Sequence, residues 1–154
     1  MGRLLALSLL VAATAAQAQP SPAEVVTWTV RAEGARRGAE ARVVFEAVLA
    51  PGWKMYALDS AVGRPLTVSL DALPPGVTAG AVRQSAPQRA HDDVFDAEAA
   101  TFSGTARIEQ PLRVSRQTLR GRHAVSGAVR YAVCDAAICL PPAAAPFRVT
   151  LAVR

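Results

Sequence analysis

Apolar and polar residues alternate along most of the chain, which is the pattern of a β-strand with one buried face. In the first such stretch, Val26, Trp28 and Val30 are separated by polar threonines. The same alternation predicts further strands over residues 43–49, 66–70, 102–114, 124–134 and 147–153. Glycine and proline separate these stretches, and no amphipathic helix stands out, although residues 97–100 are compatible with a helical turn. Short strands joined by tight turns predict an all-β sandwich or barrel.

The last two predicted strands flank the only two cysteines of the chain. Cys134 and Cys139 are separated by four residues, and Leu-Pro-Pro follows at residues 140–142. If the flanking strands pair as a hairpin, the cysteines lie at or near its neck, close enough for a disulfide. Proline has no backbone N–H, so the segment after Cys139 is not expected to be a central strand. It is expected to offer an extended, unpaired edge beside a sulfur, where a partner protein can dock.

A bond between the two cysteines would contribute little to stability. It would close a loop of six residues, which is worth about 2 kcal/mol against about 4.7 kcal/mol for a 100-residue loop. The chain has 154 residues and is long enough to bury a sizeable core without such a crosslink. The small contribution favours a pair that opens and closes, but the spacing alone leaves a structural and a redox-active disulfide both open.

The segment YAVCDAAICLPP, residues 131–142, resembles the cysteine segment of the amino-terminal periplasmic domain of the transmembrane thiol:disulfide interchange protein DsbD. Three further segments agree in order, namely PGWKMYA at 51–57, LPPGV at 73–77 and HDDVF at 91–95. Together with the last strand, these segments extend the resemblance over essentially the whole chain after residue 18. The resemblance implies an immunoglobulin-like β-sandwich, which agrees with the strand pattern.

The resemblance also implies a function and a site. The expected function is thiol–disulfide exchange without a bound cofactor, through a Cys134/Cys139 dithiol–disulfide pair. The expected electron donor is a membrane protein of the DsbD transmembrane type, and the recipients are periplasmic isomerases or thioredoxin-like proteins, including those of cytochrome c maturation. In the family the second cysteine, here Cys139, bonds the partner and Cys134 resolves the link. The remaining candidate residues are Tyr56 and Tyr131 in a pocket, Asp92, Asp93 and Phe95 in a cap loop, and Leu140, Pro141 and Pro142 at the partner edge.

The cap loop, residues 91–96, is a polar stretch with a single phenylalanine among aspartates. The resemblance implies that Phe95 folds over the cysteine pair. A reduced dithiol in an oxidising compartment is consumed unless access to it is restricted, since exchange depends on the thiolate and on its accessibility. Nearby carboxylates, those of Asp92, Asp93 and Asp96, would raise the pKa of the thiols and slow unwanted exchange. Residues 53–56 are expected to form a second loop, which brings Tyr56 to the cysteines.

The amino-terminal segment predicts export. Arg3, an apolar run over 4–15 and a small-x-small site over 16–18 are features of a secretory signal peptide. The apolar run is too short for an ordinary membrane-spanning helix, so the mature protein is expected to be periplasmic and not membrane-spanning. An oxidising compartment favours pairing of the cysteines. The remaining 136 residues, 154 minus 18, fit one domain over residues 19–154. The family's membrane segment and thioredoxin-like domain are not found in the sequence, so a stand-alone carrier is expected.

The charge distribution and the motifs of the sequence argue against several other functions. The net charge is +5, and the scattered arginines form no basic stripe of the kind that binds nucleic acid. A metal site built from Cys134, Cys139, His91 and His123 contains suitable ligand types, but its spacing is not an ordinary zinc signature. The sequence contains no nucleophile elbow or catalytic triad of the kind that hydrolytic enzymes use. The main alternative to a redox carrier is a β-sandwich interaction or chaperone-like module with an inert disulfide.

Overall fold

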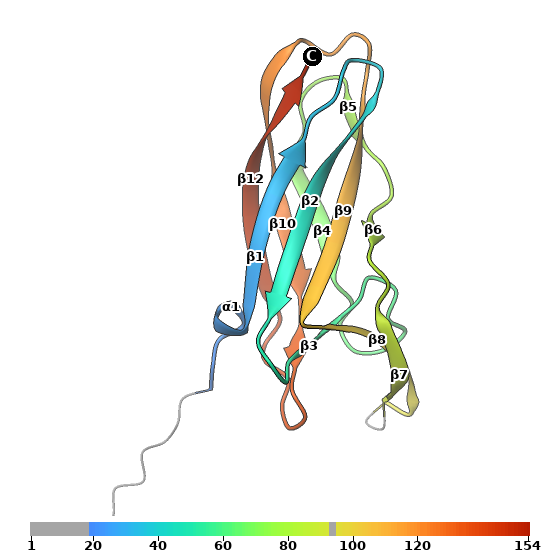
Figure 1. The fold of residues 1–154 in the computed structure, drawn as a ribbon, viewed down its shortest axis with the longest axis vertical. Coiled ribbons are helices and arrows are strands. Elements are labelled where there is room, and N and C mark those ends of the chain that lie inside the picture. The colour runs from blue at the N-terminus through green and yellow to red at the C-terminus, as the bar shows by residue number, and fades with distance from the viewer. Residues whose placement is uncertain (1–18, 93–94) are drawn as a thin grey trace, which may run out of the picture.

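The computed structural model describes residues 19–92 and 95–154 (Figure 1). The predicted signal peptide and Asp93 of the predicted cap loop lie outside the described residues. Within these residues the elements are one short helix and twelve strands, in the order α1 (Pro22–Val25), β1 (Val26–Glu33), β2 (Glu40–Leu49), β3 (Lys54–Tyr56), β4 (Thr67–Ala72), β5 (Val77–Ala79), β6 (Arg83–Gln84), β7 (Gln88–Asp92), β8 (Ala97–Ser103), β9 (Thr105–Val114), β10 (Gly121–Tyr131), β11 (Val133–Cys134) and β12 (Ala143–Val153). No helix in the described part of the chain is long and apolar enough to cross a membrane.

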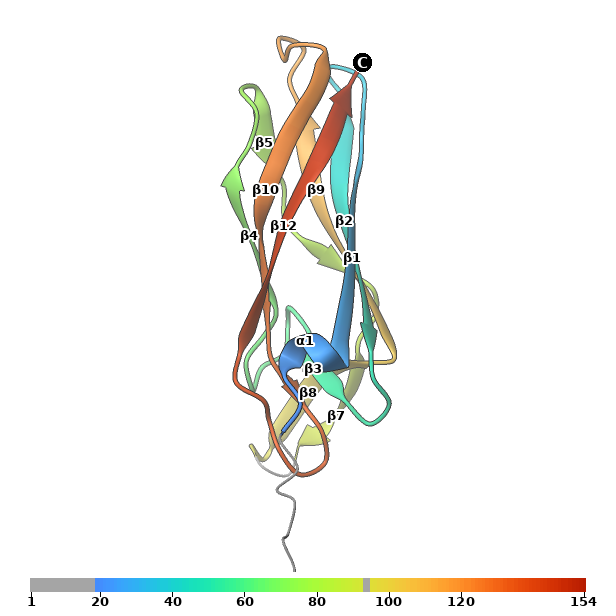
Figure 2. The same ribbon diagram turned by 90° about the vertical axis from the view of Figure 1, so that its left-hand side faces the viewer.

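The strands form three antiparallel sheets. One sheet has the order β1-β2-β9-β5, with β6 also paired to β9, and a second has the order β12-β10-β4. These two sheets face each other as the layers of a sandwich (Figures 1 and 2). The third sheet, β11-β3-β8-β7, lies at the end of the sandwich away from the carboxyl terminus and is called here the tip sheet. The predicted all-β, immunoglobulin-like sandwich is confirmed.

The core lies between the two layers and follows the alternation in the sequence. Phe45 on β2 and Phe147 on β12 meet across the sandwich with ring centroids 4.9 Å apart in an edge-to-face arrangement. Side chains that are fully buried come from both layers and include Val43, Phe45, Ile108, Leu112, Val125, Val129 and Leu151. Burial of one such side chain stabilises the fold by about 1.5–3 kcal/mol. The scaffold is therefore held by its core and not by the crosslink.

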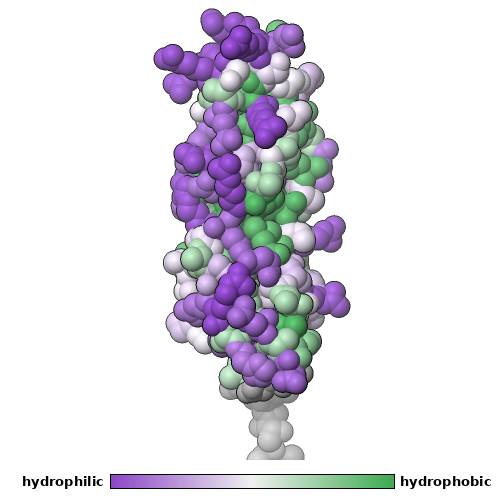
Figure 3. Space-filling model, turned by 90° about the vertical axis from the view of Figure 1, so that its right-hand side faces the viewer, coloured by the Kyte–Doolittle hydropathy of each residue, from purple (hydrophilic) through white to green (hydrophobic). Residues whose placement is uncertain are grey.

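Apolar side chains also reach the surface as a narrow band along one edge of the sandwich (Figure 3). Hydrophilic side chains gather at the end that carries the carboxyl terminus. There an open cavity is lined by Arg36, Arg37, Arg116, Arg120 and Arg154. This basic end is remote from the tip sheet.

The predicted hairpin around the cysteines is confirmed. Strands β10 and β12 pair continuously from Gly121 opposite Val153 to Tyr131 opposite Ala143. Strand β12 begins directly after Pro142, four residues before the predicted start at residue 147. It includes Pro146, which is tolerated because β12 is the last strand of its sheet. The cysteine segment therefore projects from the closed end of this ladder into the tip sheet.

Several local predictions about the tip sheet are wrong. The single strand expected over residues 102–114 is divided at Gly104, whose φ of +75° favours glycine, into β8 and β9, which lie in different sheets. Residues 97–100, compatible with a helical turn, belong to β8, because their pairing with β7 overrides the helix preference of alanine. The loop expected over 53–56 is mostly strand β3, and β7 includes the first two residues of the expected cap loop.

Candidate functional site

The two cysteines face each other across the end of the tip sheet. Strand β11 continues the direction of β10 after Ala132 and pairs with β3, so that Cys134 lies opposite Lys54. Cys134 and Cys139 form a disulfide, with their Cα atoms 3.9 Å apart. The Leu140 N–H donates to the carbonyl of Val133 at 2.9 Å. The disulfide thus links the two sides of an antiparallel hairpin, and backbone hydrogen bonds also hold these two sides together.

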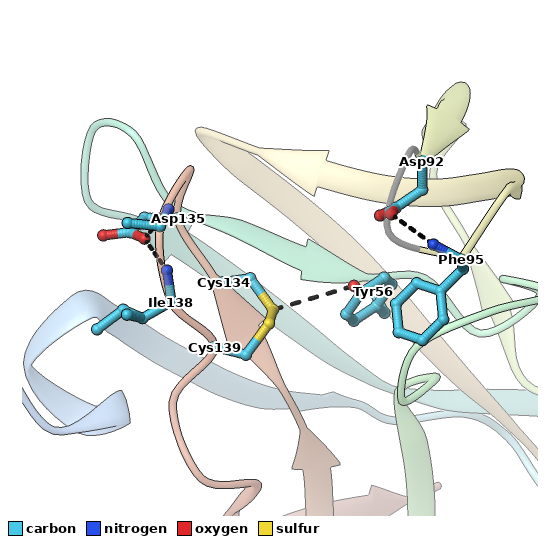
Figure 4. Close-up of a disulfide and its surroundings, with 8 residues drawn as sticks. Tyr56, Asp92, Phe95, Cys134, Asp135, Ile138 and Cys139 are labelled. Atoms are coloured by element: carbon cyan, nitrogen blue, oxygen red, sulfur yellow. Dashed lines mark hydrogen bonds between the residues drawn. A yellow bond between two sulfur atoms is a disulfide. The ribbon is translucent and has the colours of Figure 1, made fainter.

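The loop between the cysteines is held by the Asp135 side chain. Its Oδ1 accepts hydrogen bonds from the N–H groups of Ile138 at 2.7 Å and Ala137 at 2.8 Å, as Figure 4 shows for Asp135 and Ile138. The Asp135 N–H in turn donates to the Ile138 carbonyl at 2.9 Å. These bonds, that from Ile138 first, lower the pKa of Asp135 because they stabilise its charged form. These hydrogen bonds therefore hold the loop in addition to the crosslink.

The two cysteines differ in exposure. Cys139 is exposed and Cys134 is partly buried. Leu140, directly after Cys139, is 3% exposed and packs into the core, so it anchors the arm that carries the exposed cysteine. Attack by an incoming thiolate requires access to the sulfur. Of the two cysteines, Cys139 is the more exposed to such an attack.

Tyr56 on β3 lies beside Cys134, the less exposed of the two cysteines. Its side chain is buried, and its hydroxyl oxygen lies 4.0 Å from Cys134 Sγ (Figure 4). Burial raises the pKa of Tyr56, and the Asp92 carboxylate raises it further. The hydroxyl consequently stays protonated at neutral pH and, since a half-cystine has no proton, it is the donor toward the sulfur. Gly63 lies against the ring, where an added Cβ would come within 2.3 Å of the Tyr56 Cζ.

A cavity of about 280 Å³ surrounds the disulfide. It is lined by Tyr56, Gly63, Arg64, Phe95, Ala132, Cys134, Cys139, Leu140 and Pro142. Phe95 is 49% exposed, and its ring lies beside Tyr56 (Figure 4). The Phe95 N–H donates to Asp92 Oδ1 at 3.3 Å. An apolar hollow with two aromatic rings therefore opens at the disulfide, and Asp92 fixes the backbone from which Phe95 projects.

Other predicted site residues lie near this cavity without lining it. Tyr131 is buried and packs edge-to-face on Trp28 with centroids 5.5 Å apart. Burial raises its pKa, and it lines a neighbouring groove. Pro141 is exposed. Asp96 lies 3.4 Å from His91 Nε2.

The four residues considered for a metal site are not brought together. His91 is on β7 in the tip sheet, whereas His123 pairs with Leu151 near the carboxyl end of the chain. His123 Nε2 lies 2.7 Å from the Leu119 carbonyl oxygen. In residues 19–92 and 95–154, no group of three or more His, Cys, Asp or Glu side chains is arranged to hold a metal ion.

Four residues of the site were not among the predicted site residues: Gly63, Arg64, Ala132 and Asp135. An aspartate that begins a tight turn is a known signal for side-chain capping of the turn, so Asp135 was accessible to sequence reasoning. Gly63 and Arg64 lie in the connection between β3 and β4. No local pattern marks them, because only the folded chain brings this connection beside the cysteines.

The fold and the site together define a class of protein: an immunoglobulin-like domain that carries a disulfide with one exposed cysteine at one end. The profile of one family matches residues 17–151, and this family is described as thiol:disulfide interchange protein DsbD, N-terminal. The chain belongs to this family of DsbD amino-terminal domains. No curated protein matches the sequence.

Two solved structures are similar over most of the chain. One is the crystal structure of the Neisseria meningitidis DsbD amino-terminal domain in the reduced form, with a TM-score of 0.57, 16% identity, and coverage of 86% of this chain and 90% of that chain. The other is the amino-terminal periplasmic domain of ScsB from Proteus mirabilis, with a TM-score of 0.52, 16% identity, and coverage of 82% of this chain and 45% of that chain. At this identity the similarity shows the shared fold.

Proposed function

We propose that the Cys134–Cys139 pair is a redox carrier in the periplasm. It receives reducing equivalents from a membrane electron-donor protein of the DsbD transmembrane type and passes them to periplasmic thioredoxin-like or isomerase proteins. Residues 1–18 are the export signal, and residues 19–154 form one domain. Membership of the DsbD amino-terminal family supports the exchange chemistry, and the description of the ScsB relative as periplasmic supports the location.

One observation carries the proposal, which is the unequal exposure of the two cysteines. Cys139 is exposed and Cys134 is partly buried beside Tyr56. A disulfide that only braces the fold has no need of an open side, whereas exchange requires in-line access to one sulfur. The cavity around the bond is lined by both cysteines, and the exposed Cys139 is the one that we expect an incoming thiolate to attack.

The proposed reaction transfers two electrons and two protons. A donor thiolate attacks Cys139 Sγ, the Cys134–Cys139 bond breaks, and Cys134 leaves as a thiolate that takes up a proton. The second donor thiol attacks the mixed disulfide and releases Cys139 as a thiolate, so the donor is oxidised and this pair is reduced. With the recipient the steps run in the opposite direction. The Tyr56 hydroxyl, 4.0 Å from Cys134 Sγ, is placed to donate to the sulfur that leaves.

A trapping experiment tests the proposal. In the Cys134→Ala variant the exposed Cys139 remains and cannot be released by its neighbour, so mixed disulfides with exported proteins should accumulate. Cys139→Ala is the matched control, because its remaining sulfur is partly buried, and it should trap fewer partners. If neither folded and abundant variant traps a partner, the inert-disulfide alternative is correct. A reduction potential below about −300 mV, as in structural disulfides, would lead to the same conclusion.

We further propose that Phe95 restricts access to the reduced pair. Its ring lines the cavity beside Tyr56, and Asp92 holds its backbone through a hydrogen bond. Phe95→Ala should speed the oxidation of the reduced protein by small disulfides. Leu119→Ala is the control, since Leu119 is also an exposed large apolar residue, at 77%, but lies in the connection between β9 and β10. Equal oxidation rates in the wild type and Phe95→Ala would show that the ring is no lid.

A further inference from the structure

A second hollow adjoins the cysteine cavity, and its charged residues are basic. Its volume is about 360 Å³, and it shares Arg64 and Pro142 with the cavity around the disulfide. The other residues that line it are Pro65, Thr67, Arg130, Tyr131, Ala143 and Ala144. We call it the Arg64–Arg130 groove. Because the two hollows share a wall, a partner whose cysteine reaches Cys139 would also lie over this groove.

The strand register explains the shape of the groove. Arg130 on β10 lies opposite Thr67 on β4 and Ala144 on β12, and directly opposed residues project from the same face of a sheet. Both neighbours are short, so they leave a depression around the longer Arg130 side chain. Arg130 and Arg64 are both exposed. Two guanidinium groups are thus available to a bound molecule.

Most arginines of the β1-β2-β9-β5 sheet and of the tip sheet lie close to a carboxylate, and Arg64 and Arg130 differ from them in this respect. Arginines that lie within ion-pair distance of a glutamate or aspartate are Arg31, Arg42, Arg83, Arg89 and Arg107. In the part of the chain that the structure describes, no glutamate or aspartate lies within ion-pair distance of Arg64 or Arg130. No described glutamate or aspartate lines the groove or the cavity around the disulfide. The positive charge beside the disulfide is therefore not neutralised within the described chain.

We infer that the Arg64–Arg130 groove binds an acidic segment of the disulfide-bearing partner protein and positions the partner's sulfur against Cys139. The inference rests on the proposed redox function. Guanidinium groups bind carboxylates through paired hydrogen bonds, and complementary charge speeds the encounter of two proteins. Pro142 has no N–H donor for strand addition, so recognition at this wall depends on side chains.

The probes for a test are two synthetic peptides, each closed by one internal disulfide. One has two glutamates beside a cysteine, and the other has glutamines at the same positions. The reduced protein transfers two electrons and two protons to the peptide disulfide and becomes the Cys134–Cys139 disulfide. The second-order rate is measured for both peptides at low and high salt, with hydroxyethyl disulfide as an uncharged small probe.

For the wild type we expect the glutamate peptide to react about ten times faster at low salt, because steering by charge is strong there and is screened by salt. Arg64→Glu/Arg130→Glu should abolish or invert this preference, and Arg64→Gln/Arg130→Gln should abolish it. The matched control is Arg122→Glu/Arg148→Glu. It changes the net charge by the same amount as the groove variant, but Arg122 on β10 and Arg148 on β12 lie outside the groove. This control should keep the preference. The preference is the ratio of the two peptide rates within one variant, so the rate with hydroxyethyl disulfide, measured for every variant, separates a change in the intrinsic reactivity of the thiols from a change in recognition.

A wild-type preference close to one, or an equal loss in the groove and control variants, would overturn the inference while leaving the redox function intact. A failure of the wild type to exchange with any of the three disulfides would overturn the proposed function, and the inference with it. Thermal unfolding of each variant followed by circular dichroism shows that a change in rate is not a change in folding.

Discussion

Removal of the Cys134–Cys139 bond should lower the free energy of unfolding by only about 2 kcal/mol. The bond closes a loop of six residues, at a sequence separation of 5, and the loop-closure entropy of so short a loop is worth about 2 kcal/mol. The arms of the hairpin remain held without it, by the Leu140 to Val133 hydrogen bond and by those of the Asp135 side chain. The reduced protein should therefore stay folded.

The same difference in unfolding free energy limits how far the fold can shift the reduction potential of the disulfide. In a thermodynamic cycle, the stability difference between oxidised and reduced protein equals the difference in reduction free energy between the folded and unfolded chain. About 2 kcal/mol corresponds to roughly 40 to 50 mV for a two-electron couple, since 30 mV is about 1.4 kcal/mol. The fold should thus shift the potential of the disulfide only slightly to the negative, which leaves it reducible by thioredoxin-like proteins.

Urea unfolding measures this difference directly. With a slope of about 2 kcal/mol per molar urea, the midpoint of the reduced protein should lie about 1 M below that of the oxidised protein. Cys134→Ala/Cys139→Ala serves as the control, and its midpoint should agree with that of the chemically reduced wild type. A loss of about 4 kcal/mol or more, or unfolding on reduction, would refute the reasoning and identify the disulfide as a structural staple.

Three further predictions concern the surroundings of the disulfide. Gly63→Ala should lower the unfolding free energy by about 1–3 kcal/mol, because the new Cβ would press on the Tyr56 ring; Gly52→Ala, with a similar φ but open space around it, should cost less, and equal losses in urea unfolding would contradict this. Leu140→Ala should cost about 2–5 kcal/mol in the same assay, since the side chain is 3% exposed, and a loss below 1 kcal/mol would show that it is no anchor. The lowered pKa of Asp135 means that its contribution to the loop is present above the unfolded pKa of about 3.9 and is lost as the pH falls through the lower folded pKa. Loop amide resonances in NMR should therefore shift with a midpoint below 3.9, and Asp135→Asn should remove that titration; an unchanged titration would assign it to another group.

The long strands were predictable because each has one buried face over many residues. Strands β2, β10 and β12 have 10 or 11 residues each, enough for alternation to be recognised. The tip sheet was not predictable in this way. Strands β3 and β11 have three and two residues, and their pairing depends on partners that are distant in the sequence.

In the candidate site, too, some residues could be predicted from the sequence and others could not. Cys134 and Cys139 are conspicuous in the sequence because no other cysteine is present. Tyr56 and Phe95 became candidates only through the resemblance to DsbD, and the structure places both in the cavity around the disulfide. Arg64 lines the same cavity, yet no spacing or composition marks it among 17 lysines and arginines. Its position is a property of the folded chain alone.

The boundary between the sandwich and the tip sheet has a consequence for how such proteins diverge. The ladder of β10 and β12 ends at Tyr131 and Ala143, before either cysteine is reached. Insertions or deletions between the cysteines therefore leave every cross-strand pair of that ladder in place. Mutation can lengthen, shorten or recharge the reactive end while the scaffold keeps its register, so new partner preferences can arise without a penalty in folding.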